Sequence, residues 1–252
     1  MENDSWFKIF KEHSENDFIL FCFHYAGGSA AHYKEWANDL IKGIDLVAVQ
    51  MPGRENRFAE KIIDNMGKLI NVLSENFSTF KNKKIIFFGH SLGALVAFEL
   101  LKKLESEAFL DFRHLIVSAS RAPHLEIHRK PIYNLPEEEI IQEIQKFEGI
   151  PEELLEEKEL LRKIMVPIIR ADFCISDLYK CSTNDKISSR ITAFGGSEDY
   201  TFPLEHLLMW KIHSENFSYE LFKGGHFFTK TSYKDVISSI NKILAKEING
   251  GC

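Results

Sequence analysis

The sequence contains only four cysteines in 252 residues, too few for a dense disulfide framework. No two of them form a C-x-x-C pair. The four are Cys22, Cys174, Cys181 and Cys252. We expect reduced thiols, as is typical of a cytoplasmic protein.

The chain also has no secretory signal and no long hydrophobic run. Its start, MENDSWFKIFKEHSEND, is polar and acidic and does not contain a positive region followed by an apolar one. No apolar stretch approaches the roughly 20 residues that a membrane-spanning helix needs. We therefore expect a protein that is not secreted, does not contact a membrane and is located in the cytoplasm.

The sequence also has fewer basic than acidic residues. Lys and Arg number 31 against 37 Asp and Glu, which gives a formal net charge of −6. Domains that bind nucleic acid concentrate basic residues on one face, so we expect no nucleic-acid partner. Hydrophobic residues, by contrast, make up 44% of the chain, enough at this length to bury a sizeable core.

Six apolar runs bounded by turn residues recur along the chain, and helical patterns lie between them. Near-continuous Val, Ile and Phe content is typical of parallel strands that are covered on both faces. The runs are FILFCF (18–23), DLVAVQ (45–50), KIIFFG (84–89), HLIVSAS (114–120), RITAFGG (190–196) and YELFKGG (219–225). The clearest helical patterns cover residues 65–77, 92–104 and 233–248. This alternation predicts a mostly parallel, doubly wound α/β sheet.

One segment interrupts the alternation. Residues 130–182 contain helical patterns without a strand, and this stretch is too long for a simple crossover. We predict a helical lid insertion over the carboxyl edge of the sheet, within a single domain that spans residues 1–252.

The peptide GHSLG (89–93) places Ser91 at a sharp corner between an apolar strand and a helical pattern. The G-x-S-x-G spacing in this context matches a nucleophile elbow. Glycines fit where the strand and the helix press together, and the helix that begins at Leu92 directs its positive end toward the serine. We interpret Ser91 as a nucleophile, the alternative being a turn residue that caps the helix. His90 is expected to be a packing or hydrogen-bonding neighbour.

A serine hydroxyl needs a base to take its proton. In chains with this elbow, the partners follow in the order serine, acid, histidine, each after a later strand. His226, in KGGHFF after the last predicted strand, is the candidate base. Asp199, in GGSEDY just past the preceding strand, is the candidate acid, with its neighbour Glu198 as the competitor.

Attack of a serine on a carbonyl creates an oxyanion, which backbone N–H groups can stabilise. One candidate donor is the N–H of Leu92, directly after the nucleophile. The second is expected from FHYAGGSA (23–30), at Ala26, with Gly27 as an additional candidate. The alternative for this glycine-rich stretch is an ordinary flexible turn.

Several motifs together resemble those of type II thioesterases, in the same order and over about residues 18–245. They are HYAGGSAAHYKEW, VAVQMPGRENR, FFGHSLGALVAFEL, VSASRAP, GGSED and FKGGHFF. Type II thioesterases are the stand-alone hydrolases that accompany nonribosomal peptide and polyketide synthases. The resemblance implies an α/β-hydrolase fold with a mobile helical lid and a catalytic triad of Ser91, Asp199 and His226. The sequence departs from the family at His24, where proline is common, and at Leu92, where methionine is common.

The resemblance also implies a substrate and a partner. The substrate is an aberrant or stalled acyl group on the phosphopantetheine arm of an acyl or peptidyl carrier protein. Hydrolysis proceeds through an acyl-enzyme and needs no metal or other cofactor. We expect a monomer.

The motifs also suggest roles for two arginines, one aspartate and several apolar residues of the insertion. Arg54 and Arg121 are interpreted as structural, ion-pairing arginines rather than as contacts to the carrier or its phosphate, and Asp172 as a contact of the lid or core. Apolar residues of the insertion are expected to line an acyl or pantetheine channel. These are Leu154, Leu155, Ile164, Met165 and Phe173.

Three other functions stay open from the sequence alone. A medium-chain acyl-carrier-protein thioesterase of fatty acid synthesis carries the same motifs, and its chain-length preference depends on the shape of the insertion. A hydrolase of small esters would share the elbow but ignore carrier proteins. A non-catalytic carrier-binding module would keep the fold without its chemistry.

Overall fold

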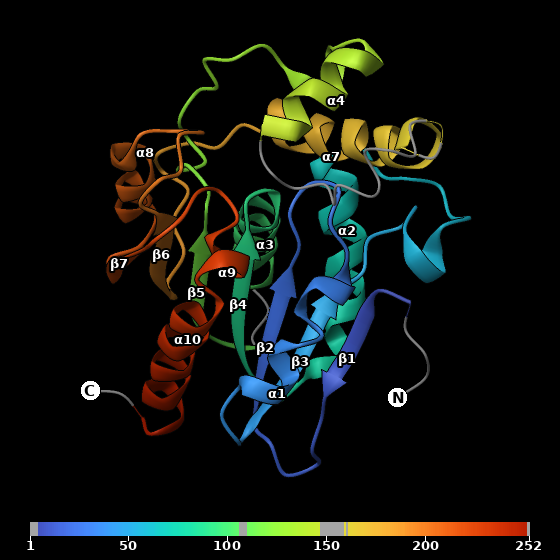
Figure 1. Cartoon of the computed structure of the whole chain (residues 1–252). Coiled ribbons are helices and arrows are strands. Elements are labelled where there is room, and N and C mark those ends of the chain that lie inside the picture. Colours follow the sequence, from blue (N-terminus) through green and yellow to red (C-terminus); the bar gives the residue numbers. More distant parts are fainter. Residues whose placement is uncertain (1–4, 106–109, 147–158, 160, 251–252) are drawn as a thin grey trace.

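The computed structural model describes residues 5–105, 110–146, 159 and 161–250. Its centre is a seven-stranded sheet with the order β1-β3-β2-β4-β5-β6-β7 (Figure 1). Only the pair of β1 and β3 is antiparallel within this sheet, so the predicted mostly parallel α/β architecture is confirmed. The strands are β1 (Phe7–Lys11), β2 (Phe18–Phe23), β3 (Ile44–Val49), β4 (Lys84–His90), β5 (Asp111–Ser118), β6 (Arg190–Gly196) and β7 (Phe217–Phe222).

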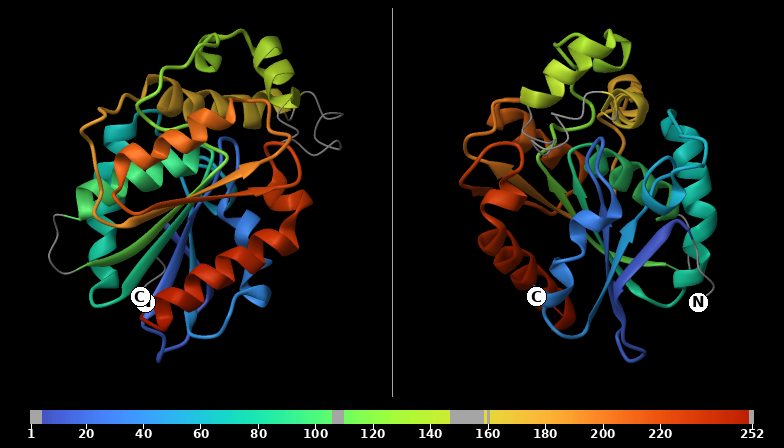
Figure 2. Two further views of the ribbon diagram at one scale, coloured as in Figure 1. Left: turned by 90° about the vertical axis from the view of Figure 1, so that its left-hand side faces the viewer. Right: turned by 45° about the vertical axis from the view of Figure 1, so that its right-hand side comes forward.

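The sheet has a hydrophobic core on each face, because successive residues of a strand point to opposite sides. On β2, Phe21 lies in the core formed with α2 (Met66–Asn76) and α3 (Leu92–Leu104). Its neighbour Cys22 lies in the opposite core, which is covered by α10 (Tyr233–Ile248). Figure 2 shows these helices on the two sides of the sheet. This double cover explains why the central strands are apolar throughout.

Strand β1 is the one element of the sheet that the sequence analysis missed. It is an edge strand in which only Phe7 is fully buried, and Lys8 and Lys11 interrupt its apolar pattern. Lysines on edge strands discourage pairing with other chains, and here they also obscure the strand in the sequence.

Helices from the insertion lie beyond the carboxyl ends of the strands (Figure 1). They are η4 (Ile132–Asn134), α4 (Glu137–Lys146), η5 (Leu161–Met165) and α7 (Val166–Leu178). A small core of their own joins them, formed by Ile132, Ile140, Val166 and Ile169. The remaining elements include η1 (Ala30–Tyr33), α1 (Trp36–Asp39), η2 (Glu55–Arg57), η3 (Phe77–Phe80), α8 (Leu204–Leu208), η6 (Met209–His213) and α9 (Phe228–Thr231). Among the helices of the described ranges, none combines the length and the apolar character needed to cross a bilayer.

Helix α3 packs against the sheet at very short range because two glycines flank its start. A Cβ atom on Gly93 would lie 2.1 Å from the carbonyl oxygen of Phe23 on β2. A Cβ atom on Gly89 would lie 2.3 Å from the carbonyl oxygen of Gly93. Both contacts are to backbone, which cannot rotate away, so neither position accepts a side chain without moving α3.

We predict that Gly93→Ala lowers the free energy of unfolding by about 3 kcal/mol, since overpacking of this kind forces backbone shifts. Urea denaturation monitored by circular dichroism measures the effect. Gly67→Ala is the matched control, because Gly67 is an exposed residue of α2 whose added Cβ meets only Asn65 Oδ1, at 3.4 Å. An alanine there should raise stability by about 0.5–1 kcal/mol. Equal stability of the two variants would contradict the packing argument.

Candidate active site

Ser91 lies at the corner between β4 and α3, as the elbow motif predicts. Its backbone has φ 55° and ψ −116°, a conformation that costs a non-glycine residue about 1–3 kcal/mol. The N–H of Ser91 donates a 2.7 Å hydrogen bond to the carbonyl of Ser118 on β5, which helps hold the corner in place. The side chain consequently points away from the packed elements and lines a cavity.

His226 joins Ser91 and Asp199 in one hydrogen-bonded chain. Its Nδ1 lies 2.9 Å from Asp199 Oδ2, and its Nε2 lies 3.1 Å from Ser91 Oγ. Asp199 follows β6 and His226 follows β7, so three separate strand ends supply the three side chains. A carboxylate only accepts hydrogen bonds, so Nδ1 carries the proton and Nε2 is left to accept the hydroxyl proton of Ser91. The three predicted residues are thus within bonding distance of one another.

Thr201 supports the carboxylate of Asp199, a role that the sequence analysis missed. Both its hydroxyl and its N–H donate to Asp199 Oδ1, at 2.7 and 3.0 Å. Burial tends to raise the pKa of Asp199, but the hydrogen bonds from His226 and Thr201 and the charge of His226 outweigh it and lower this pKa. The carboxylate therefore stays ionised at neutral pH. The sequence does contain an indication of this role. In Asp-x-Thr, the aspartate side chain often accepts a hydrogen bond from the backbone N–H two residues later.

The competing candidates lie elsewhere. Glu198 is exposed, and its backbone N–H bonds to the carbonyl of Gly224, while its carboxylate has no hydrogen bond within the described part of the chain. His90 is fully buried, and its Nδ1 lies 2.9 Å from the hydroxyl of Ser118. The interpretation of His90 as a hydrogen-bonding neighbour is therefore confirmed.

Two of the three proposed oxyanion donors line the cavity and have no hydrogen bond from their N–H groups to other described residues. Ala26 and Leu92 line the cavity beside Ser91. Among the hydrogen bonds of the described residues, none engages the N–H of Ala26 or of Leu92. Gly27 differs, because its N–H donates a 2.8 Å hydrogen bond to Asp172 Oδ2. The suggestion that Gly27 is an oxyanion donor was therefore wrong.

The cavity above Ser91 has a volume of about 1210 Å³ and reaches under the insertion. Met165, Ile169 and Phe173 line it from η5 and α7. Met165 and Phe173 were predicted to do so, and Ile169 was not. Ile164 is not one of the described lining residues, and the predicted residues Leu154 and Leu155 lie outside the described ranges. The wall that α7 supplies is mostly apolar, with Ser176 as its polar member, and suits a hydrocarbon chain.

The two predicted ion-pairing arginines differ in their contacts. Arg54 forms a buried pair with Asp172 through two hydrogen bonds of 2.9 Å, which confirms its structural interpretation. Arg121 instead donates to the carbonyl oxygens of Ala122 and Leu125. It has no carboxylate partner among the residues that the structure describes, so the prediction of an ion pair was wrong for Arg121.

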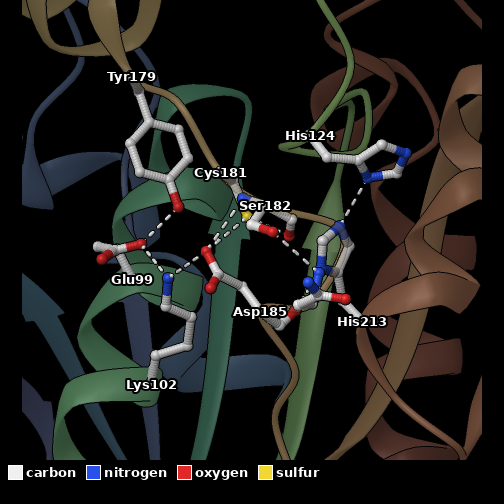
Figure 3. Close-up of polar contacts among 9 residues, drawn as sticks. Glu99, Lys102, His124, Tyr179, Cys181, Ser182, Asp185 and His213 are labelled. Atoms are coloured by element: carbon white, nitrogen blue, oxygen red, sulfur yellow. Dashed lines mark hydrogen bonds and ion pairs between the residues drawn. The ribbon is translucent and has the colours of Figure 1, made fainter.

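A polar cluster outside the cavity joins the end of the insertion to α3 (Figure 3). Lys102 of α3 bridges Glu99, at 2.9 Å, and Asp185, at 3.0 Å. The hydroxyl of Tyr179, the first residue after α7, donates to Glu99. The segment that returns from the insertion is therefore fixed to the helix that begins beside Ser91.

Two histidines extend this cluster to the start of the insertion (Figure 3). His213 Nδ1 lies 2.6 Å from the carbonyl oxygen of Asp185 and must donate to it, so its Nε2 accepts from His124 Nδ1 at 2.8 Å. Burial lowers the pKa of both imidazoles, in accord with neutral rings. His124 precedes the insertion and Asp185 follows it, so both ends of the insertion are tied together.

The cysteines of the described residues, Cys22, Cys174 and Cys181, are free thiols, and Cys252 lies outside those residues. Cys181 lies in the polar cluster, with its Sγ 3.3 Å from Asp185 Oδ2. Burial and this hydrogen bond raise the pKa of Cys181 to about 12. A thiol with so high a pKa is a poor nucleophile, and Cys181 is not among the described residues that line the cavity beside Ser91.

Comparison with known proteins agrees with this geometry. Residues 18–244 match the family of the thioesterase domain. The chain is 34% identical over 248 residues to the linear gramicidin dehydrogenase LgrE of Brevibacillus parabrevis, covering 97% of this chain and 94% of that protein. It is 33% identical over 242 residues to the gramicidin S biosynthesis protein GrsT of Aneurinibacillus migulanus, covering 96% and 94%.

Solved structures show the same likeness. The type II thioesterase BorB from the borrelidin biosynthetic cluster aligns with a TM-score of 0.86 and 30% identity, covering 96% of this chain and 98% of that one. Together with the sheet order and the strained corner at Ser91, this likeness confirms the predicted α/β-hydrolase fold.

Two further histidines near the glycine-rich loop make the protein sensitive to acid. Burial and the charge of Arg54 lower the pKa of His24 to about 4, and burial and the charge of Lys230 lower that of His32 to about 4. The ordinary value is 6.5, so between about pH 6.5 and 4 the unfolded chain binds protons that the folded chain does not. The contribution of these two neutral imidazoles to stability is therefore fully present above pH 6.5 and is lost as the pH falls toward 4.

We predict that His24→Asn reduces this loss by up to about 3 kcal/mol, because the amide keeps a donor for the carbonyl of Tyr25 but does not titrate. Urea denaturation at several pH values between 7 and 4 measures the effect. His13→Asn, at an exposed histidine, is the control and should leave the pH dependence of stability unchanged. An equal acid response in all three proteins would refute the assignment to His24.

Proposed function

The chain belongs to the thioesterase domain family, and from this membership we propose that it is a stand-alone, type II thioesterase. It hydrolyses aberrant or stalled acyl groups from the phosphopantetheine arm of carrier proteins in nonribosomal peptide or polyketide synthesis. Its similarity to GrsT and to BorB supports this assignment, because their names place them in the biosynthesis of such products.

The observation that carries the proposal is the hydrogen-bonded chain of Ser91, His226 and Asp199. These three hydrogen-bonded side chains can remove the hydroxyl proton of the serine, which then attacks a carbonyl in acyl transfer. LgrE is named a dehydrogenase, but hydride transfer has no use for an activated serine. The geometry therefore favours thioester hydrolysis for this chain.

The first half-reaction transfers the acyl group to the enzyme. Ser91 Oγ attacks the thioester carbonyl while its proton moves to His226 Nε2, and Asp199 stabilises the imidazolium that forms. The N–H groups of Leu92 and Ala26 hold the oxyanion of the tetrahedral intermediate, each lowering the barrier by about 3 kcal/mol. Collapse of the intermediate breaks the C–S bond, and the thiolate takes the proton from His226. The products are a free pantetheine thiol and an ester on Ser91.

The second half-reaction restores the serine. His226 Nε2 removes a proton from water, and the resulting hydroxide attacks the ester carbonyl. A second oxyanion forms in the same site and collapses, with the proton of His226 passing to Ser91 Oγ. The acyl group leaves as a carboxylic acid, and the chemistry needs no metal or diffusible cofactor.

The insertion at residues 130–182 is proposed to act as the lid of this site, within a single domain. The apolar side chains of Met165, Ile169 and Phe173 support this role because they cover the cavity from above. They would contact the acyl chain while Ser91 attacks. An acyl or peptidyl carrier protein is the proposed partner, and we propose that the enzyme acts as a monomer in the cytoplasm.

We predict that Ser91→Ala lowers the rate of acyl release from loaded carriers by at least about 10³-fold, because no other group replaces the nucleophile. Release of radiolabelled acyl groups measures the rate. A phosphonate fluoride should add its mass to the wild type and to Ser74→Ala, but not to Ser91→Ala. Ser74 is a partly exposed serine of α2 whose hydroxyl donates to the carbonyl of Asn71. If Ser91→Ala released acyl groups at the wild-type rate, the protein would be a carrier-binding module without this chemistry.

A panel of carriers loaded with acetyl through decanoyl groups tests the substrate. We expect a shallow dependence of kcat/KM on chain length, as suits an enzyme that removes many kinds of stalled group. A steep rise toward decanoyl would instead indicate a medium-chain thioesterase of fatty acid synthesis. Equal rates on free esters and on loaded carriers would indicate a hydrolase that does not recognise carriers.

A further inference from the structure

The turn that contains the proposed donor Ala26 is held by a carboxylate from the insertion. Residues 25–28 form a tight turn in which the N–H of Gly28 donates to the carbonyl of Tyr25 at 2.9 Å. Gly27 has φ 78°, which is the value expected at the third residue of a type II turn. In a type I turn the central peptide is rotated by about 180°, so its N–H points to the other side.

Asp172 of α7 engages the central peptide of this turn in the type II form. Its Oδ2 accepts the N–H of Gly27 at 2.8 Å, and that N–H belongs to the central peptide of the turn. Rotation of this peptide would remove one of the hydrogen bonds to the buried carboxylate and aim the carbonyl of Ala26 toward it. Asp172 is fully buried, so water cannot replace the lost hydrogen bond.

Arg54 completes the arrangement from a third part of the chain. It donates two 2.9 Å hydrogen bonds to the carboxylate of Asp172 and a 3.0 Å hydrogen bond to the carbonyl of Gly28. The side chain of Arg54 is 5% exposed, so the pair is nearly free of solvent screening. The turn is thus bonded at Gly27 to the insertion and at Gly28 to the loop after β3.

We propose that Asp172 and Arg54 are positioning residues for the oxyanion site. By anchoring the turn at Gly27 and Gly28 they fix the position of the preceding peptide, which carries the N–H of Ala26. Because Asp172 belongs to α7, the oxyanion site is complete only while α7 is in place over the cavity. This inference rests on the proposed function, since it needs an oxyanion to form beside Ser91. It assigns to the insertion a part in the chemical step, in addition to contact with the acyl chain.

The packing of α7 on the turn supports this coupling. A Cβ atom on Gly27 would lie 2.9 Å from Cγ1 of Ile169, one helical turn before Asp172. Helix and turn are therefore in direct contact through Ile169 as well as through the carboxylate. A shift of α7 away from the sheet would separate both contacts at once.

The test compares kcat and KM for a carrier-independent substrate, the propionyl thioester of N-acetylcysteamine. Asp172→Asn should lower kcat about 10²-fold and leave KM within about threefold, because removal of one oxyanion donor typically costs 10²–10³ in kcat. Arg54→Lys keeps both charges but loses the hydrogen bond to Gly28, and should lower kcat about 10-fold. The double variant Arg54→Met with Asp172→Leu removes the turn's support without leaving a buried charge unpaired, and should lower kcat as Asp172→Asn does.

Asp177→Asn is the matched control on the same helix. Asp177 is 1% exposed, pairs with Arg129 at 2.7 Å and accepts the N–H of Ile132 at 2.7 Å, but makes no contact with the turn. This variant should keep kcat within about threefold of the wild type. The pH dependence of kcat/KM should be the same in every variant, since the triad is untouched.

The outcomes separate this inference from the proposed function. If the wild type releases acyl groups from neither this thioester nor loaded carriers, the proposed function fails; if it acts on loaded carriers alone, the variants are compared on loaded carriers. If the wild type is active and every folded variant keeps kcat within threefold of Asp177→Asn, the positioning role is overturned. Circular dichroism and thermal melting identify the folded variants, and Arg54→Lys, which retains the charge balance, keeps the comparison decisive if Asp172→Asn does not fold.

Discussion

The close approach of α3 to the sheet is the constraint on which the rest of the site depends. Hydrogen is the only side chain that fits at Gly93 against the carbonyl of Phe23, and Gly89 has a similar restriction. The chain between them must then turn within a single residue, Ser91, which is forced to a positive φ. The strained corner raises the hydroxyl above the sheet and directs the N-terminal end of α3 at it.

The parallel sheet brings the other components to the same edge. Strands β6 and β7 end beside β4 and β5, so the loops that contain Asp199 and His226 meet above the hydroxyl of Ser91. Thr201 then fixes the carboxylate, which fixes the tautomer of the imidazole. The backbone of the sheet and its loops therefore fixes where the three side chains lie, and hydrogen bonds between them then fix their orientation.

The sequence was sufficient for features that depend on local pattern. The central strands, α3 and α10 could be predicted because double burial gives uniform apolar runs and helical periodicity. Ser91, Asp199 and His226 could be located because the elbow has a fixed spacing and the strand ends that follow it are recognisable. Strand β1 was missed, because an edge strand with two lysines has no such run.

Contacts between distant segments could not be predicted in the same way. Asp172 and Arg54 are separated by 118 residues, and nothing in either local pattern indicates that they meet. The error at Gly27 has the same origin, because its N–H is engaged by a residue 145 positions away. Within the described ranges Arg121 has no carboxylate partner, and carbonyl oxygens of its own loop accept its hydrogen bonds instead. Local sequence patterns identify helices, strands and motifs, whereas the folded chain determines which N–H groups and side chains already have hydrogen-bond partners.

The strained backbone of Ser91 has an evolutionary consequence. A glycine would adopt φ 55° without strain, so selection for folding alone would favour glycine at this position over time. If the hydroxyl of Ser91 were not needed for catalysis, replacement of Ser91 by glycine would therefore increase stability. The hydroxyl of Ser91 is thus retained at a cost of about 1–3 kcal/mol in folding stability.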